Sequence, residues 1–165
     1  MPVGGITTLV RNAFPNDFIE VNNKSKEWAD LVIERESIYH VFIDHFRSTC
    51  FIAEDRGEMI GYLLGYRSQT HPELAVIHLI QVAPRLRGNG VGRRMFNQFQ
   101  TVVKAMGCTK VNAFGRPENK YCTGFYTAMG FQIQATEHTI EVNGVQAIKD
   151  YNGPGKHVVV WQKEL

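Results

Sequence analysis

The chain alternates between short segments in which every second residue is apolar and longer segments in which apolar residues recur every three or four positions. The first pattern is typical of strands and the second of helices. The strands predicted from short apolar or alternating segments cover residues 6–11, 49–54, 59–66, 75–82, 110–114, 131–141 and 157–162. The predicted helices cover residues 18–23, 36–47, 91–106 and 119–129, and Gly107 and Gly130 end the last two.

Turn-forming residues connect these elements. Residues 55–58 and the Asn143-Gly144 pair predict hairpin turns, and Pro15-Asn16-Asp17 is typical of a helix start. The order is a strand, two helices, three strands, a helix, a strand, a helix and further strands. It indicates an α/β (α+β) fold with a mixed sheet and helices on both faces. We expect a single domain over residues 1–165, because no repeat, low-complexity segment or long linker divides the chain.

The composition narrows the class of protein. Hydrophobic residues make up 44% of the chain and charged residues 21%, which is ordinary for a soluble globular protein. Neither a run of about 18 apolar residues nor a signal-peptide pattern is found, so no membrane span is expected. The three cysteines, Cys50, Cys108 and Cys122, are odd in number and have no CxxC spacing. We therefore expect reduced thiols in a cytoplasmic protein.

Charge is distributed unevenly along the chain. The net charge is only +2, but residues 74–117 contain no Asp or Glu and seven Lys or Arg residues. A basic segment in a near-neutral chain suggests an anionic ligand. A nucleic acid would fit such a patch, yet the cations surround glycines rather than follow a helix face. This arrangement favours a compact phosphate ligand and makes nucleic acid an unlikely partner.

The most informative segment runs from the end of an apolar strand into a helix and reads Val82-Ala83-Pro84-Arg85-Leu86-Arg87-Gly88-Asn89-Gly90-Val91-Gly92-Arg93. Its glycines allow a close backbone approach, and the first N–H groups of the helix converge on one place. This geometry is suited to a pyrophosphate, with Arg87 and Arg93 adding charge-assisted hydrogen bonds. The segment matches neither the Rossmann fingerprint nor the P-loop. A plain turn with packing glycines is the alternative.

Two motifs in this region resemble those of a known family. Arg87-Gly88-Asn89-Gly90-Val91-Gly92 matches the [QR]-x-x-G-x-[GA] signature of the GCN5-related N-acetyltransferase (GNAT) superfamily. A second segment, Asn119-x-x-Cys122-x-x-x-Tyr126-x-x-x-Gly130-Phe131, resembles the family pattern N-x-x-A-x-x-x-Y-x-x-x-G-F, with Cys122 in place of the usual small residue. The resemblance covers residues 75–131.

The resemblance implies a mostly antiparallel central sheet whose strands part where acetyl-CoA binds. It implies an acetyl-CoA-dependent N-acetyltransferase that acts on a primary amine of a small molecule or peptide. By this resemblance, pantetheine would contact the main chain of Ile80, Gln81 and Val82. The pyrophosphate would be bound by the amides of Gly88, Asn89, Gly90, Val91, Gly92 and Arg93, with Arg87 beside them. Asn119 and Tyr126 would contact the pantetheine arm.

The resemblance also implies a catalytic role for Tyr126, which would protonate the departing thiolate. A tyrosine that fills the core is the alternative. The family often has a glutamate as general base at the position of Val76, where this chain has none. His78, two residues further on, is the candidate base, because the ordinary pKa of histidine suits proton acceptance. A core histidine is the alternative, and Glu73 is a second candidate base.

Other features leave several alternatives open. Tyr39, His40, Asp44 and His45 could line the acceptor cleft, and the loop over residues 150–155 could shape it or merely connect two strands. No metal is expected, because His40 and His45 share no helix face with another ligand. The absent glutamate leaves a non-catalytic acyl-CoA-binding or sensor module as the alternative function. The sequence is compatible with a homodimer.

Overall fold

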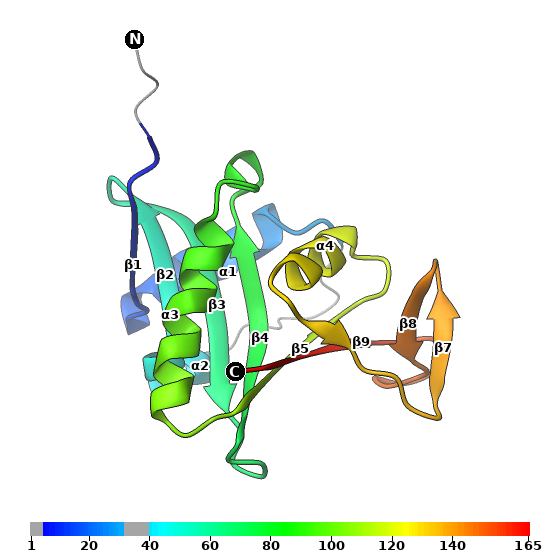
Figure 1. The fold of residues 1–165 in the computed structure, drawn as a ribbon. Helices are drawn as coiled ribbons and strands as arrows, with labels where there is room; N and C mark the ends of the chain where they lie inside the picture. Colours follow the sequence, from blue (N-terminus) through cyan, green and yellow to red (C-terminus); the bar gives the residue numbers. More distant parts are fainter. Residues whose placement is uncertain (1–4, 32–39) are drawn as a thin grey trace.

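The computed structural model describes residues 5–31 and 40–165. A sheet of seven strands in the order β1-β2-β3-β4-β5-β9-β6 lies between helices on both faces, and β7 and β8 form a separate hairpin (Figure 1). The strands are β1 (Thr8–Asn12), β2 (Cys50–Asp55), β3 (Glu58–Arg67), β4 (Leu74–Val82), β5 (Lys110–Gly115), β6 (Gln132–Ile133), β7 (Thr139–Val142), β8 (Val145–Ile148) and β9 (Val159–Glu164). The helices are α1 (Phe18–Glu27), α2 (His40–His45), α3 (Val91–Ala105) and α4 (Lys120–Ala128).

This arrangement confirms the predicted mixed α/β fold. Only the β4–β5 pair is parallel among the strand pairs of the described residues. Antiparallel neighbours need only short turns, whereas the parallel pair requires the long crossover that α3 provides. Short turns of 3-10 helix complete the chain at η1 (Pro15–Asp17), η2 (Arg47–Thr49) and η3 (Pro84–Leu86).

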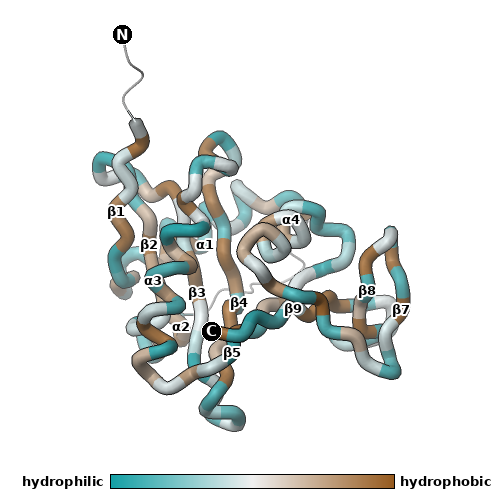
Figure 2. The backbone as a smooth tube through the Cα atoms, viewed as in Figure 1, coloured by the Kyte–Doolittle hydropathy of each residue, from teal (hydrophilic) through white to brown (hydrophobic). Residues whose placement is uncertain are grey.

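Two hydrophobic cores lie on opposite faces of the sheet. On one face, the apolar side of α3 packs with α4 over the central strands through residues such as Phe96, Phe99 and Tyr126. On the other face, α1 and α2 pack against β2 and β3 through Val21, Ile43 and other buried residues. Figure 2 shows that β4 is apolar along most of its length, as expected of a strand covered on both sides. None of the helices in the described ranges has the length and apolar content needed to span a membrane.

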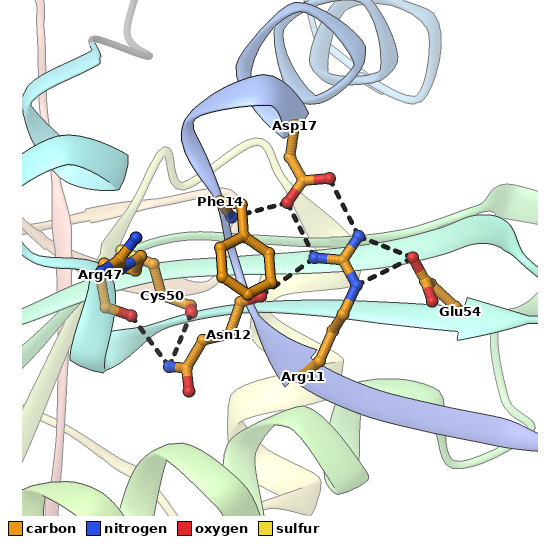
Figure 3. A network of polar contacts seen from close by, with 7 residues as sticks. All are labelled: Arg11, Asn12, Phe14, Asp17, Arg47, Cys50 and Glu54. Carbon is orange, nitrogen blue, oxygen red and sulfur yellow. Dashed lines mark hydrogen bonds and ion pairs between the residues drawn. The ribbon is translucent and has the colours of Figure 1, made fainter.

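A cluster of charged residues fixes the start of α1. The Arg11 guanidinium donates hydrogen bonds to Asp17 at 2.8 and 2.9 Å and to Glu54 at 2.6 and 3.0 Å (Figure 3). Asp17 also accepts a hydrogen bond of 2.7 Å from the Phe14 N–H. Burial by itself would raise the pKa of Asp17, but the bonds from Arg11 and Phe14 hold that pKa below its ordinary value. The chain is thereby turned from β1 into η1, after which α1 runs through Glu27, further than the predicted residue 23.

The strand predicted over residues 131–141 is wrong. Pairing stops after Ile133 in β6 and resumes only at Thr139 in β7. Between them, the Thr136 N–H donates to Thr139 Oγ1 at 2.7 Å, and the Thr139 N–H donates to the Thr136 carbonyl at 3.1 Å. Threonine side chains that bond nearby main-chain groups compete with a strand ladder. The predicted turn at Asn143-Gly144 joins β7 to β8, with both residues at positive φ.

Smaller differences concern where elements begin and end. The predicted helix over residues 36–47 is described only from His40, and it ends at His45, because η2 follows it. Residues 36–39 lie outside the described part of the chain. The last strand is β9, which begins at Val159 rather than at residue 157. β9 lies between β5 and β6 of its own chain.

Candidate functional site

The central sheet parts between β4 and β5. The two strands pair only from Leu74↔Lys110 to Ile77↔Ala113. Beyond these pairs β4 continues to Val82, while β5 continues to Gly115 beside β9. In the part of the chain that the structure describes, no strand pairs with the second half of β4 on its β5 side. Apart from the Val82 carbonyl, which accepts a hydrogen bond from Arg87, its main-chain groups on that side are therefore available to a ligand.

A bulge in β4 lies at the point where the strands part. Leu79 pairs with Leu64 and Ile77 pairs with Gly65, so β4 contains one extra residue, His78, between two consecutive pairs. A bulge bends a strand and increases its twist. The apolar pattern of residues 75–82 does not reveal this bulge.

The direction of the main-chain groups along β4 follows from one hydrogen bond. The Ala83 N–H donates to the Ile60 carbonyl of β3 at 2.9 Å. Because successive residues of a strand point their main-chain groups to opposite sides, Val82 and Ile80 direct theirs toward the opening, and Gln81 directs its own toward β3. The Gln81 side chain accepts a 2.6 Å hydrogen bond from the Tyr62 hydroxyl. Of the three β4 residues expected to contact pantetheine, Ile80 and Val82 have the suitable direction.

The glycine-rich loop leads from this free edge into α3. Gly88 and Gly90 have φ values of 80° and 81°, and none of the described residues has an atom within 4 Å of where a Cβ would be. Gly92 differs, because a Cβ there would lie 2.8 Å from Cε2 of Phe125 on α4. The first two glycines thus provide a left-handed backbone and open space, and the third lets α3 approach α4.

The N-terminus of α3 is suited to an anion. The first N–H groups of a helix have no acceptor within the helix, and no side chain caps α3 at Gly90. The first turn contains no acidic residue. The helix dipole and the unpaired N–H groups of Val91, Gly92 and Arg93 therefore act together. The Asn89 side chain bonds the Leu86 carbonyl at 3.2 Å and closes the loop upon itself.

Arg87 links the loop to two distant elements. Its guanidinium donates hydrogen bonds to Asp30 at 3.0 Å, to the Trp28 carbonyl at 2.9 Å and to the Val82 carbonyl at 3.3 Å. It also lies over the ring of Tyr121 on α4, 4.4 Å from the ring centroid. The sequence indicated Arg87 as a phosphate ligand but gave no sign of these partners. The side chain is positioned at the free edge of β4, next to the expected pyrophosphate site.

α4 brings the second motif to the same opening. The Asn119 side chain caps this helix by accepting a 3.1 Å hydrogen bond from the Cys122 N–H. Arg93 reaches the other end of α4, where its guanidinium donates to the Ala128 carbonyl at 3.4 Å. Burial raises the pKa of Cys122 to about 11, with Asp30 adding to the rise and Arg87 opposing it. The thiol therefore remains protonated at neutral pH.

Tyr126 is packed among aromatic side chains. Its ring centroid lies 5.2 Å from that of Phe125, 5.1 Å from that of Phe131 and 5.0 Å from that of Trp161. The residue is 3% exposed, and burial raises its pKa well above the ordinary value. It contributes to the core and keeps its hydroxyl protonated over the neutral range. The packing interpretation is thus confirmed, and the catalytic role expected of Tyr126 stays a prediction.

His78 lies on the face of the sheet opposite to α3. Its ring stacks on that of Phe42 from α2, with centroids 4.4 Å apart and planes 16° apart. Val76, at the position of the absent glutamate, is 6% exposed. Glu73 is exposed and precedes β4, about 16 Å along the strand from His78 at about 3.3 Å per residue. Of the two candidate bases, His78 is the one at the opening.

The residues expected to line an acceptor cleft are described only in part. Tyr39 lies outside the described residues. The His40 ring stacks on Phe18 with centroids 3.6 Å apart, and His40 Nδ1 is 3.9 Å from a carboxylate oxygen of Asp44. Within the ranges that the structure describes, no group of three or more His, Cys, Asp or Glu residues could hold a metal ion.

The class of protein to which this sheet and this site belong is identified by comparison with known families. The chain matches the model of the "Acetyltransferase (GNAT) family" over residues 9–131. Because this match spans more than half of the chain, the protein belongs to the GNAT family of acetyltransferases. The family and the enzyme class predicted from the two motifs are confirmed.

Individual relatives are distant. L-2,4-diaminobutyric acid acetyltransferase of Halomonas elongata is 22% identical over 128 residues, which are 77% of this chain and 67% of that enzyme. The enzyme of the same name from Vibrio parahaemolyticus is 31% identical over 68 residues, which are 40% of this chain and 38% of that enzyme. For the second relative, the match thus spans little more than a third of its length.

Solved structures share the fold. Ard1 from Thermoplasma volcanium has a TM-score of 0.78 at 17% identity, covering 97% of this chain and 99% of that one. Diaminobutyrate acetyltransferase EctA from Paenibacillus lautus, in complex with L-2,4-diaminobutyric acid and coenzyme A, has a TM-score of 0.71 at 19% identity, covering 95% of each chain. At such identities the likeness concerns the fold.

Proposed function

We propose that this protein transfers an acetyl group from acetyl-CoA to a primary amine of a small molecule or peptide. The observation that carries this proposal is the free edge of β4, which leads through η3 and the glycine-rich loop to the N-terminus of α3. A pantetheine arm needs main-chain partners along its length, and a pyrophosphate needs converging N–H groups at its end. The named relatives, which include diaminobutyric acid acetyltransferases and an N-terminal acetyltransferase subunit, support the same activity.

The residues of the site fit coenzyme A. Ile80 and Val82 would hold the pantetheine amides, and the loop from Gly88 to Arg93 would hold the pyrophosphate. The open space beside Gly88 and Gly90 leaves room for phosphate oxygens. Asn119 and Tyr126 would flank the arm from the α4 side. When bound, the cosubstrate would supply the activated thioester whose acetyl group is transferred.

The chemistry requires two proton movements. The amine nitrogen forms a bond to the acetyl carbon while the carbon–sulfur bond breaks, so the amine must lose a proton and the thiolate must gain one. His78 would accept the first proton; this role is supported by its position as the first β4 residue beyond the paired segment. Tyr126 would donate a proton to the sulfur. A main-chain N–H near Val82 would stabilise the oxyanion.

The test combines turnover with cofactor binding. Purified protein is mixed with acetyl-CoA and a panel of amines that includes polyamines, amino acids, arylalkylamines and peptides, and the release of free thiol is followed. Titration calorimetry measures coenzyme A binding separately. Tight binding without thiol release from any amine would contradict the enzyme and support a sensor module. Absence of both would contradict the site itself.

Replacing Tyr126 by Phe tests its assigned role. We expect kcat to fall about 100-fold, within the usual range for loss of a proton donor, with KM for acetyl-CoA unchanged. The ring contacts persist in the variant, so its melting temperature should stay close to that of the wild type. An unchanged kcat would show that Tyr126 only fills the core.

We also propose a cytoplasmic location, supported by the free cysteines Cys50, Cys108 and Cys122. Fractionation of cells that express the protein with its native ends tests it. A homodimer remains a prediction. Because β9 is already paired on both sides within its own chain, a dimer would use another surface. Light scattering across a range of concentrations would decide the oligomeric state.

A further inference from the structure

Two aromatic residues flank the point where the sheet parts. Ile77 and Ala113 form the last β4–β5 pair, so His78 and Phe114 are the first residues beyond it on each strand. Ile77 and Ala113 both belong to the core under α3. By alternation, His78 and Phe114 point to the opposite face, the face of α1 and α2. They lie on the two sides of the opening.

Each of these rings is backed by a second aromatic ring from a distant segment. Phe42 of α2 stacks on His78, as described above. Tyr151, from the loop between β8 and β9, stacks on Phe114 with centroids 6.1 Å apart and planes 30° apart. The strand pairing and the two ring stacks thus place one aromatic pair on each side of the opening, although the four residues are far apart in sequence.

Tyr66 of β3 extends the group on the β4 side. Its ring centroid lies 6.2 Å from that of Phe42. Burial raises the pKa of Tyr66, and Tyr151 adds to that rise. Phe42, Tyr66 and His78 thus lie on the β4 side of the opening, and Phe114 and Tyr151 lie on the β5 side. We refer to them as the aromatic collar.

The loop that carries Tyr151 is held in shape by its own hydrogen bonds. The Asp150 N–H donates to His157 Nδ1 at 3.0 Å, and the Gly155 N–H donates to Asp150 Oδ1 at 2.7 Å. The carboxylate of Asp150 is thus used within the loop. Tyr151 itself is 52% exposed, so it presents its ring to solvent at the outer side of the collar.

We propose that the aromatic collar is the entrance for the acceptor and that Tyr151 determines specificity, favouring primary amines on an uncharged apolar or aromatic group. The inference rests on the proposed function. Aromatic faces attract an ammonium group and pack against apolar chains. Partial removal from water also lowers the pKa of the amine, which favours the neutral form that attacks the thioester.

The experiment compares two acceptors and three variants. Steady-state rates are measured with 2-phenylethylamine and with L-2,4-diaminobutyric acid, for wild type, Tyr151→Ala, Tyr151→Phe and Phe14→Ala. Phe14 is 48% exposed and lies between Arg11 and Arg47, away from the collar, so it is a matched control for loss of an exposed ring. Melting curves verify that each variant is folded.

We expect the wild type to prefer 2-phenylethylamine by about tenfold or more in kcat/KM, the effect of one good aromatic contact. Tyr151→Ala should lower kcat/KM for this amine about tenfold through KM, with KM for acetyl-CoA unchanged. Tyr151→Phe and Phe14→Ala should stay within about twofold of wild type, because the first keeps the ring and the second lies elsewhere.

Two results would overturn the proposal. A wild type that prefers L-2,4-diaminobutyric acid, or an active enzyme that Tyr151→Ala leaves unchanged, refutes the collar and leaves the acetyltransferase activity intact. If the wild type binds coenzyme A but acetylates no amine, the proposed function has failed and the collar fails with it. The activity of the wild type distinguishes the two failures: the wild type acetylates an amine if only the collar is wrong, and it acetylates none if the proposed function is wrong.

Discussion

The contact between Asp30 and Arg87 gives a quantitative test of the cofactor site. Arg87 has five N–H donors, and three of its hydrogen bonds go to Asp30, Trp28 and Val82. The carboxylate of Asp30 therefore competes with an incoming phosphate for the same positive charge. Asp30→Asn keeps the size and shape of the side chain and removes its charge. We expect coenzyme A to bind this variant more tightly than it binds the wild type.

The size of the effect follows from the exposure of the pair. The side chains of Arg87 and Asp30 are 21% and 35% exposed, and the contact distance is 3.0 Å. Partly exposed pairs of this kind contribute about 0.5–1 kcal/mol. Releasing Arg87 from Asp30 should therefore improve coenzyme A affinity about two- to fivefold. The free energy of unfolding should fall by a similar amount, about 0.5–1 kcal/mol.

Titration calorimetry with coenzyme A at low and high ionic strength measures this gain, which should shrink as salt screens the charges. Glu58→Gln is the matched control, because Glu58 pairs with Arg85 at 2.8 Å in the same loop, but with side chains 63% and 61% exposed. This control should change the affinity by less than about twofold. A weakening of threefold or more in Asp30→Asn would refute the competition and show that Asp30 positions Arg87 for the ligand.

Two further predictions concern stability. Gly65→Ala would place a Cβ 2.6 Å from Phe99 Cε2 and 2.7 Å from the Val76 carbonyl, so it should cost about 1–3 kcal/mol in urea unfolding. In Gly124→Ala of α4, the new Cβ would have no atom of the described residues within 4 Å, so the free energy of unfolding should rise by about 0.5–1 kcal/mol. Equal effects of the two substitutions would contradict the packing described. Burial raises the pKa of Cys50 from 9.0 to about 11, so the unfolded chain loses its thiol proton first as pH rises. The free energy of unfolding of the wild type should therefore fall by about 2–3 kcal/mol as the pH rises from 9 to 11. Cys50→Ala should lack this fall. If the free energies of unfolding of the two proteins change with pH in parallel, the prediction is wrong.

Turns and helices that depend on a few neighbouring residues could be predicted from the sequence. The glycine loop and α3 could be predicted because a left-handed backbone at Gly88 and Gly90 and a 3.6-residue apolar period are both local requirements. The turn at Asn143-Gly144 follows from the same kind of local requirement. The predicted strand over residues 131–141 failed because threonine side chains bonded the main chain around residue 136, which an apolar pattern does not reveal.

The sequence by itself determined most of the elements, the glycine-rich loop and the family. Only the tertiary structure decided which side chains meet. Arg87 bonds a carboxylate 57 residues away, at Asp30, and His78 and Phe114 lie on the two sides of the opening because β4 and β5 stop pairing after Ile77 and Ala113. The physical reason is that backbone preferences act over a few residues. Strand register, bulges and the partners of charged side chains are set by how distant segments pack.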